Sequence, residues 1–202
     1  EAEWVSLHGV GIGSSLTPAT GKTVIKKTTH ALGTSSTRNG ISYAADSVLS
    51  IVHPVDSWSQ GWNISGMDFQ GISDGDRNAY AIYAPRAAIG SMTDVTLGFA
   101  TKGFFGASCW DLVWDHVQAY NCNTGFEHNP SGNPAGTSWS FNNVSTNGCG
   151  IGFSIQGLNY STFNSCYAEG STTLSWLFGT AKNIVLNGGG GENPTGTLLS
   201  IN

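Results

Sequence analysis

The chain has 202 residues, the size of one domain, and 39% of them are hydrophobic, so it can bury a full core and is not a disordered chain. Only 10% of residues are charged, whereas glycine fills 28 positions, and both values depart from those of an ordinary soluble domain. The net charge of −5 gives no basic surface for nucleic acid and favours a neutral or polar ligand over an anionic one. No apolar run is long enough to span a membrane.

The first 60 residues carry the least regular pattern, and we expect them to form an N-terminal cap and the first irregular coils. Within them, residues 23–27 alternate as a short β-strand does, whereas Ser42–Ser50 has the best helical periodicity of the chain, although it also fits a strand. Residues 61–202 read as short alternating runs between Gly- and Asn-rich turns, which is typical of an all-β protein. The predicted division is therefore 1–60 and 61–202.

The short runs of the second part repeat at a fixed period. The clearest marker is a Gly-Phe pair, which recurs at Gly103, Gly125 and Gly152 with spacings of 22 and 27 residues. The longer interval holds a loop-like insertion at 130–136, and Glu169 and Glu192 continue the repeat at a spacing of 23. Ile64 matches Met92 at a spacing of 28 if residues 71–78 form a protruding loop. A period of this kind indicates a solenoid.

Aligning the sequence on this period brings residues of one kind into columns. A large apolar column contains Met92, Trp114, Phe141, Phe163 and Leu186, and a small one, three residues on, contains Val95, Val117, Val144, Cys166 and Gly189. Between them lies a polar column of Thr93, Asp115, Asn142, Asn164 and Asn187, whose amides we expect to hydrogen-bond along the stack. Columns at fixed phase predict rungs of about 22–23 residues stacked as a parallel β-helix.

The four cysteines form no Cys-x-x-Cys pair, so the sequence indicates neither a zinc site nor a thioredoxin-like motif. Cys122 and Cys149 lie one rung apart, at a spacing of 27 residues. We expect them to stack as unpaired thiols, and a disulfide is the alternative. No metal and no cofactor are expected.

Several stretches resemble the β-helix of phage tailspikes with pectate-lyase-like folds: 9–13 followed by 23–29, 42–46 running into 51–54, 78–85, and 164–169. The resemblance covers most of the chain and implies a single-stranded right-handed parallel β-helix. It also implies a homotrimeric virion tail protein, made in the host cytoplasm, that binds and usually cleaves a bacterial surface polysaccharide (capsule or O-antigen) outside the cell. The attachment and trimerising domains of such proteins are missing here, so we expect a section of a longer tailspike.

Two glutamates are the strongest candidates for catalysis. Glu169 and Glu192 share a column with Tyr120 and Asn147, at a phase where strand alternation points outward. Rungs are about 4.8 Å apart, and the two carboxyl groups of glycosidases are about 5–5.5 Å apart in retaining enzymes and about 6.5–9.5 Å in inverting ones. The pair predicts glycoside hydrolysis, with Tyr120 and Asn147 binding substrate. Carboxylates that merely cap solvent-facing glycine turns are the alternative.

Three further residues are predicted to bind substrate. Asp76 lies in the expected loop at 71–78, where a carboxylate can bind sugar hydroxyls; a solvated turn or a calcium site is the alternative. Glu127 and His128 stand at the start of the insertion, where solenoids often shape a binding face, and a surface turn is the alternative.

Two other functions stay open at this point. A β-helix without catalysis would be a structural shaft or a receptor-binding module. A polysaccharide lyase needs a cation beside the uronate carboxylate and a base; Arg86, Lys102 and Tyr120 are available but share no column, and the net negative charge favours hydrolysis. Sugar stacking is open to several tryptophans, namely Trp58, Trp62, Trp110 and Trp176.

Overall fold

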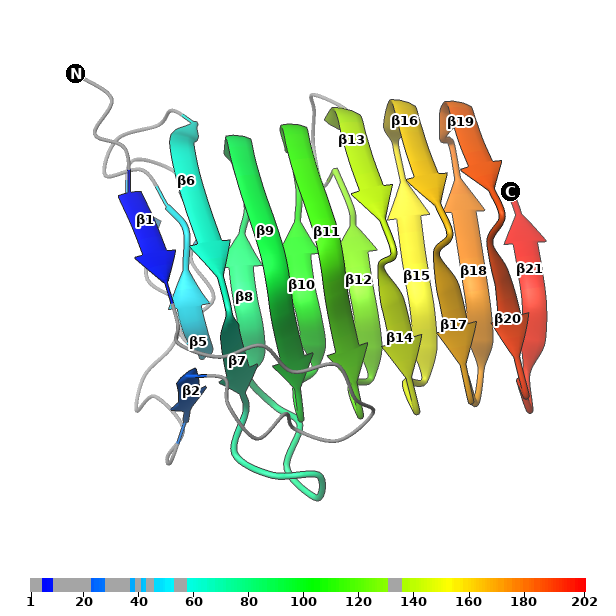
Figure 1. Ribbon diagram of the computed structural model, residues 1–202, viewed down its shortest axis with the longest axis horizontal. Helices are drawn as coiled ribbons and strands as arrows, with labels where there is room; N and C mark the ends of the chain where they lie inside the picture. The colour runs from blue at the N-terminus through cyan, green and yellow to red at the C-terminus, as the bar shows by residue number, and fades with distance from the viewer. Residues whose placement is uncertain are drawn as a thin grey trace.

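The computed structural model describes residues 5–8, 23–27, 37–38, 41–42, 46–52, 58–130 and 136–202. Over these residues the chain forms strands and no helix, and the strands advance along the long axis of the molecule from the N-terminus to the C-terminus (Figure 1). Every pairing between strands is parallel except that of β3 with β4. The predicted all-β, parallel β-solenoid is confirmed.

The larger sheet has 12 strands. Its main path is β1 (Val5–His8), β6 (Ser59–Ser65), β9 (Ala87–Gly98), β11 (Trp110–Tyr120), β13 (Gly136–Asn142), β16 (Leu158–Asn164) and β19 (Lys182–Asn187). Shorter strands continue these rungs beyond a bend: β2 (Thr23–Lys26), β7 (Met67–Gln70), β14 (Ser145–Asn147), β17 (Tyr167–Glu169) and β20 (Gly190–Glu192). The long strands β9 and β11 run through the bend and pair with both sets.

The second sheet has seven strands and forms the other wall of the solenoid (Figure 1). In spatial order it contains β5 (Ser47–Ser50), β8 (Tyr80–Ala84), β10 (Lys102–Gly106), β12 (Thr124–His128), β15 (Ile151–Gln156), β18 (Leu174–Gly179) and β21 (Thr197–Ile201). A separate antiparallel pair joins β3 (Thr37–Arg38) and β4 (Ile41–Ser42). The division of the chain at residue 60 stays a prediction, although β1, β2 and β5 already pair with the rung that follows them.

The register confirms the columns predicted from the sequence. Trp114 is paired with Met92 on one side and with Phe141 on the other, and the column continues through Phe163 to Leu186. The Gly-Phe marker holds as well, since Phe126 pairs with Phe104 and Phe153. The 28-residue match of Ile64 with Met92 is also correct, and the segment between β7 and β8 protrudes from the solenoid (Figure 1).

The core lies between the two sheets and is built from stacked aromatic rings. Trp114 and Phe141 stack at 4.1 Å between ring centroids, and Phe153 and Trp176 stack at 3.9 Å. All four side chains are almost fully buried. Burying a side chain of this size contributes about 1.5–3 kcal/mol, so the aromatic stack supplies a large share of the stability.

The polar column forms a side-chain ladder along one edge of the solenoid. Asn164 donates from Nδ2 to Oδ1 of Asn142 at 2.9 Å, and Asn187 donates to Oδ1 of Asn164 at 3.4 Å. Each amide thus bonds its equivalent on the next rung, as predicted. At Asp115 the ladder changes, because its carboxylate instead pairs with Nδ1 of His116 at 3.0 Å.

The bends of successive rungs use the left-handed backbone conformation at equivalent positions. One bend repeats at Gly66, Asp94, His116, Asn143, Ser165 and Gly188; a second repeats at Gly61, Ile89, Asp111, Ser138, Tyr160 and Asn183. Non-glycine residues with positive φ are uncommon, and Asn, Asp and Gly tolerate it best. The Asn and Gly content noted in the sequence therefore has a backbone cause at the corners of each rung.

One sequence expectation is corrected by the structure, and several predicted segments lie outside the described residues. The helical interpretation of Ser42–Ser50 is wrong for its second half, because residues 47–50 form β5 and pair with β8. Lateral pairing of alternating residues with the next rung overrides a short helical periodicity. The segments at 9–13, 28–29, 43–45, 53–54 and 131–135 lie outside the described residues.

The asparagine ladder leads to a stability prediction. Asn164→Ala should lower the free energy of unfolding by about 1–2 kcal/mol, because it leaves a donor and an acceptor without partners. Asn187→Ala, which removes only the long 3.4 Å bond at an exposed position, is the matched control and should cost less than half as much. Chemical denaturation measures both, and equal losses would show that the ladder contributes nothing specific.

Candidate functional site

Mostly polar residues occupy the outward positions along the shorter part of the larger sheet. Core residues such as Phe69, Leu97 and Ala168 face inward there, so their neighbours in each strand face outward. One outward column contains Asp68, Thr96, Gln118, Ser145, Tyr167 and Gly190, and the next contains Gln70, Gly98, Tyr120, Asn147, Glu169 and Glu192. We call these two columns the polar stripe.

The predicted catalytic pair lies at one end of the polar stripe. Asn147, Glu169 and Glu192 are register partners on β14, β17 and β20, one rung apart. Asn147 donates from Nδ2 to Oε2 of Glu169 at 2.7 Å, which orients that carboxylate. Glu169 is half-buried and Glu192 is exposed. The structure thus brings together three of the four residues as predicted, with one carboxylate held and one facing solvent.

Tyr120 belongs to the same column but is held elsewhere. Its hydroxyl contacts Oδ1 and Oδ2 of Asp68 at 3.3 and 3.4 Å, two rungs back, and Gln70 donates to Oδ2 of Asp68 at 2.6 Å. Burial and the Asp68 carboxylate raise the pKa of Tyr120 above its ordinary value. Tyr120 therefore orders a buried polar cluster, and in this structure it does not present its hydroxyl to a substrate beside Glu169.

The sequence pattern does not single out Asp68 and Gln70 as members of a polar cluster. Both are nearly fully buried, although they occupy outward positions of β7. The alternation of Met67, Asp68, Phe69 and Gln70 was visible in the sequence, and it placed polar residues on the outer side of this strand. What it could not show was the reach of Tyr120 across two rungs, because side-chain direction depends on the neighbouring rung.

Gly98 makes that reach possible. It lies between Gln70 and Tyr120 in the column, and a Cβ at this position would come within 2.1 Å of the Tyr120 ring. Real Cβ atoms do not approach another atom so closely. Glycine is therefore required here, because the tyrosine ring crosses the neighbouring rung at the place where a side chain would stand.

Glu127 and His128 are neighbours on β12 but face opposite sides of the smaller sheet. Glu127 faces outward, where Lys102 Nζ lies 2.6 Å from its Oε1. His128 faces the core: it is fully buried, its Nδ1 is 2.6 Å from the carbonyl oxygen of Gln156, and its ring packs edge-on against Trp139. Strand alternation separates the two groups, so they do not form one acid–base pair.

Burial lowers the pKa of His128 to about 4, and the neutral ring therefore donates from Nδ1 to the Gln156 carbonyl. The Nε2 atom has no hydrogen-bond partner and points toward Gly136, where a Cβ would come within 2.4 Å of it. This environment is that of a core histidine, out of reach of a ligand on the surface.

Asp76 lies in the loop that protrudes between β7 and β8. Its carboxylate accepts a hydrogen bond from Asn78 Nδ2 at 2.8 Å, and Arg77 in the same loop pairs with Asp74. Thr101 donates to the Arg77 carbonyl and ties the loop to the rung beside it. The predicted binding of substrate by the Asp76 carboxylate stays a prediction.

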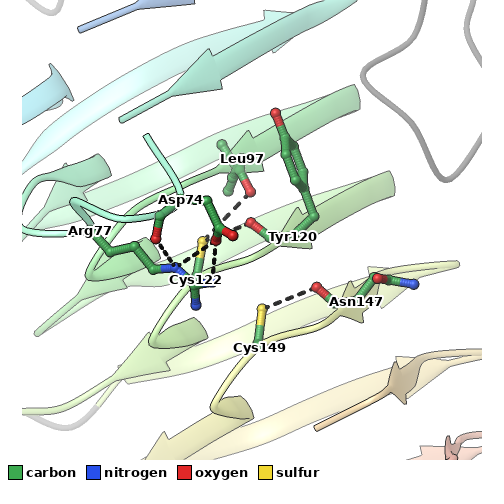
Figure 2. Close-up of polar contacts among 7 residues, drawn as sticks. All are labelled: Asp74, Arg77, Leu97, Tyr120, Cys122, Asn147 and Cys149. Carbon is green, nitrogen blue, oxygen red and sulfur yellow. Dashed lines mark hydrogen bonds and ion pairs between the residues drawn. The ribbon is translucent and has the colours of Figure 1, made fainter. Parts of the chain in front are cut away.

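The two stacked cysteines lie at the bend beside the polar stripe (Figure 2). Both are buried and free; Cys122 donates to the carbonyl of Tyr120 at 3.4 Å and Cys149 donates to that of Asn147 at 3.7 Å. Burial raises the pKa of the Cys122 thiol well above its ordinary value. The pKa of Cys149 is lowered, because the Cys122 thiol donates a hydrogen bond to it. The expected stack of unpaired thiols agrees with this arrangement.

The tryptophans proposed for sugar stacking divide into two groups. Trp62 and Trp176 are buried in the core. Trp58 and Trp110 are partly exposed and meet edge-on at 6.0 Å, with the Arg86 guanidinium 5.9 Å from the Trp58 ring centroid. Only this second pair keeps surface that a sugar could reach.

No protein-family model matches the sequence, and no curated protein matches it. The structure is similar to the tailspike gp42 of Acinetobacter phage vb_AbaP_AS12, with a TM-score of 0.65 and 16% sequence identity. The match covers 92% of this chain and 38% of that one. The two share a fold. This chain therefore has a tailspike-like parallel β-helix, and it spans less than half the length of that tailspike.

In the described part of the chain, no three His, Cys, Asp or Glu side chains gather in a way that could hold a metal ion. None of its elements is a helix long and apolar enough to cross a membrane.

The glycine in the polar stripe gives a second prediction. Gly98→Ala should lower the free energy of unfolding by about 1–3 kcal/mol, because the new methyl group forces the Tyr120 ring away from Asp68. In the Tyr120→Ala background the same substitution should cost almost nothing. A double-mutant cycle by urea denaturation measures the coupling, and purely additive losses would contradict the packing described above.

The buried histidine gives a third prediction, on pH. The folded protein keeps His128 neutral down to about pH 4, whereas the unfolded chain takes up a proton near pH 6.5. The contribution of His128 to the free energy of unfolding is therefore fully present above pH 6.5. It is lost as the pH falls from 6.5 to 4, by about 3 kcal/mol in total. His128→Asn should remove this part of the pH dependence, while His116→Asn, at an exposed corner, should leave it intact.

Proposed function

We propose that this chain is the β-helix of a phage tail protein that binds a bacterial surface polysaccharide, a capsule or an O-antigen, and depolymerises it by glycoside hydrolysis. The observation that carries the proposal is the Glu169–Glu192 register pair on adjacent rungs, with Asn147 orienting Glu169. The tailspike-like fold supports the same class of protein. Host synthesis, a place in the virion tail and assembly into a homotrimer belong to this proposal.

The geometry of the pair suits hydrolysis. Backbones one rung apart are about 4.8 Å from each other, and two glutamate side chains starting at that distance can reach either the retaining or the inverting separation. Glu169 is half-buried and held as an acceptor by Asn147, whereas Glu192 on the next rung is exposed, so the two carboxyl groups have different surroundings, as the two different roles in glycoside hydrolysis require.

The arrangement supports hydrolysis over lyase chemistry. A lyase needs a cation and a base beside one uronate. Lys102 is paired with Glu127 on the smaller sheet, Tyr120 is held by Asp68 on the larger sheet, and Arg86 lies between β8 and β9 beside Trp58. These three groups belong to different parts of the solenoid surface and do not surround one site.

The polar stripe also explains how a long polymer would lie on the surface. Hydroxyl and amide groups of Gln118, Ser145 and Asn147 follow one another along the solenoid axis toward Glu169. A chain of sugars laid along this axis would meet the partly exposed side chains of Gln118, Asn147 and Glu169 and the exposed Glu192, whereas the stripe residues on β7 and the side chains of Thr96, Tyr120 and Ser145 are buried. Only the Asn147 to Glu192 end of the stripe has carboxylates that are not buried, which supports the proposal that cleavage occurs at this end.

The proposal leads to a fourth prediction. Glu169→Gln and Glu192→Gln should each reduce cleavage of a purified capsular or O-antigen polysaccharide by on the order of 10²–10⁴-fold, the usual contribution of a positioned acid or base. A panel of Acinetobacter polysaccharides is the first substrate set to use. Reducing ends report hydrolysis, and ultraviolet absorbance of unsaturated uronates reports elimination.

The matched control is Asp115→Asn, which removes a carboxylate from the same sheet outside the polar stripe and should leave cleavage unchanged. Full activity in both glutamine variants would refute the catalytic pair. Binding of a polysaccharide without release of reducing ends would show a receptor-binding module, and new absorbance together with reducing ends would show a lyase.

A further inference from the structure

A compact group of aromatic and charged side chains stands on the outer face of the smaller sheet, on the wall of the solenoid that does not carry the polar stripe. Its members come from the three successive strands β8, β10 and β12: Tyr80, Tyr83, Lys102, Phe105 and Glu127. We call this group the aromatic platform. Glu127 was expected to bind substrate, and the structure shows which side chains surround it.

The rings of the aromatic platform form one packed unit. Tyr83 and Phe105 are register partners and stack face to face at 5.5 Å, with only 5° between their planes. Tyr80 meets both of them edge-on, at 5.4 and 5.8 Å. Mutual packing of three rings limits their rotation, so the platform is preorganised and a ligand has little side-chain entropy to overcome.

An ion pair lies over this aromatic surface. Lys102 Nζ is 2.6 Å from Oε1 of Glu127 and 4.5 Å from the Phe105 ring centroid. The side chains of Lys102 and Glu127 keep 20% and 11% of their surface exposed, so the pair reaches the solvent. The platform therefore combines two partly exposed rings, Tyr80 and Phe105, which pack on the buried Tyr83, with one donor group and one acceptor group whose charges cancel.

The solenoid core does not require these rings. Inward positions of the same strands, Ile82, Phe104 and Phe126, already fill the interior and are fully buried. Further along the solenoid, the two outward columns that hold the platform contain no aromatic ring: one continues as Thr124, Ile151, Leu174 and Thr197, and the other as Ser154, Leu177 and Ser200. Three aromatic rings on adjacent rungs are therefore a local feature of the outer surface.

The combination matches the chemistry of a sugar ring. A pyranose has a face of C–H groups, which carry partial positive charge and lie against the electron-rich face of an aromatic ring. Its rim of hydroxyl groups donates to a carboxylate and accepts from an ammonium group, and such charge-assisted hydrogen bonds are strong. A carboxylate-bearing sugar would find no net positive charge here, because Lys102 is already neutralised by Glu127.

We propose that the aromatic platform binds a neutral pyranose unit of a polysaccharide. The inference rests on the proposed function in that both assume a polysaccharide ligand, but it concerns a different face of the solenoid and requires no catalysis. The aromatic platform would give the chain a second attachment point for the polymer. A polysaccharide held at two places on the solenoid would dissociate more slowly than one held at a single place.

The test is binding of the chain to an array of neutral oligosaccharides built from glucose, galactose, mannose, rhamnose and their N-acetylated amino sugars, with polygalacturonate as the acidic probe. The double variant Tyr80→Ala with Phe105→Ala should bind the neutral ligands at least 10-fold more weakly than the unaltered chain. Leu174→Ala with Leu177→Ala is the matched control, because it removes apolar side chains from the same two columns and should bind normally.

A second pair of variants keeps the rings in case the double variant fails to fold. Lys102→Met and Glu127→Gln remove one charge each, and each should weaken binding of the neutral ligands by about 5- to 10-fold with an unchanged melting temperature. Tighter binding of polygalacturonate by Glu127→Gln than by the unaltered chain would also support the inference, since the variant leaves Lys102 without its counter-charge.

The outcomes separate this inference from the proposed function. Neutral-sugar binding that is equally strong in the platform variants and the control overturns the inference alone. Preference of the unaltered chain for polygalacturonate overturns the assignment of a neutral ligand. Loss of cleavage in Glu169→Gln with retained array binding supports both, and absence of any glycan binding or cleavage in the unaltered chain overturns both.

Discussion

In-register parallel stacking is the constraint on which the rest of this structure depends. Each residue of a rung pairs with its equivalent on the rungs before and after it, so Trp114 must fit between Met92 and Phe141, and Asn164 between Asn142 and Asn187. A side chain that packs or hydrogen-bonds well with its own kind is therefore favoured along a whole column. The same stacking repeats the left-handed bends at fixed positions, and it explains the abundance of glycine and asparagine.

On such a scaffold the candidate functional side chains lie in rows along the outer faces of the two sheets. Outward positions of the larger sheet form the polar stripe, which ends at Glu169 and Glu192, while outward positions of the smaller sheet carry the aromatic platform. Both surfaces lie on rigid strands, which hold side chains more exactly in place than loops do. The proposed hydrolysis and the proposed sugar binding are therefore assigned to two different walls of one solenoid.

Charges are scarce in this chain, and where they stand is informative. Asp68 is buried with Tyr120 and Gln70, Glu127 is paired with Lys102, and Asp74 is paired with Arg77. Asp115 contacts His116. Glu169 and Glu192 differ from these acidic groups. They are register partners on adjacent rungs, and neither carboxylate is fully buried. This contrast is the physical basis for assigning them to chemistry.

The sequence by itself determined the rung period, the composition of the core columns and the adjacency of Glu169 and Glu192, because periodic spacing fixes which residues stack. It also predicted the asparagine ladder. Only the tertiary structure decided where the side chains point: Tyr120 reaches over Gly98 to Asp68, His128 turns into the core, and Tyr80 and Phe105 pack beside Lys102. Those outcomes depend on rotamers and on the space left by neighbouring rungs, which a one-dimensional pattern does not contain.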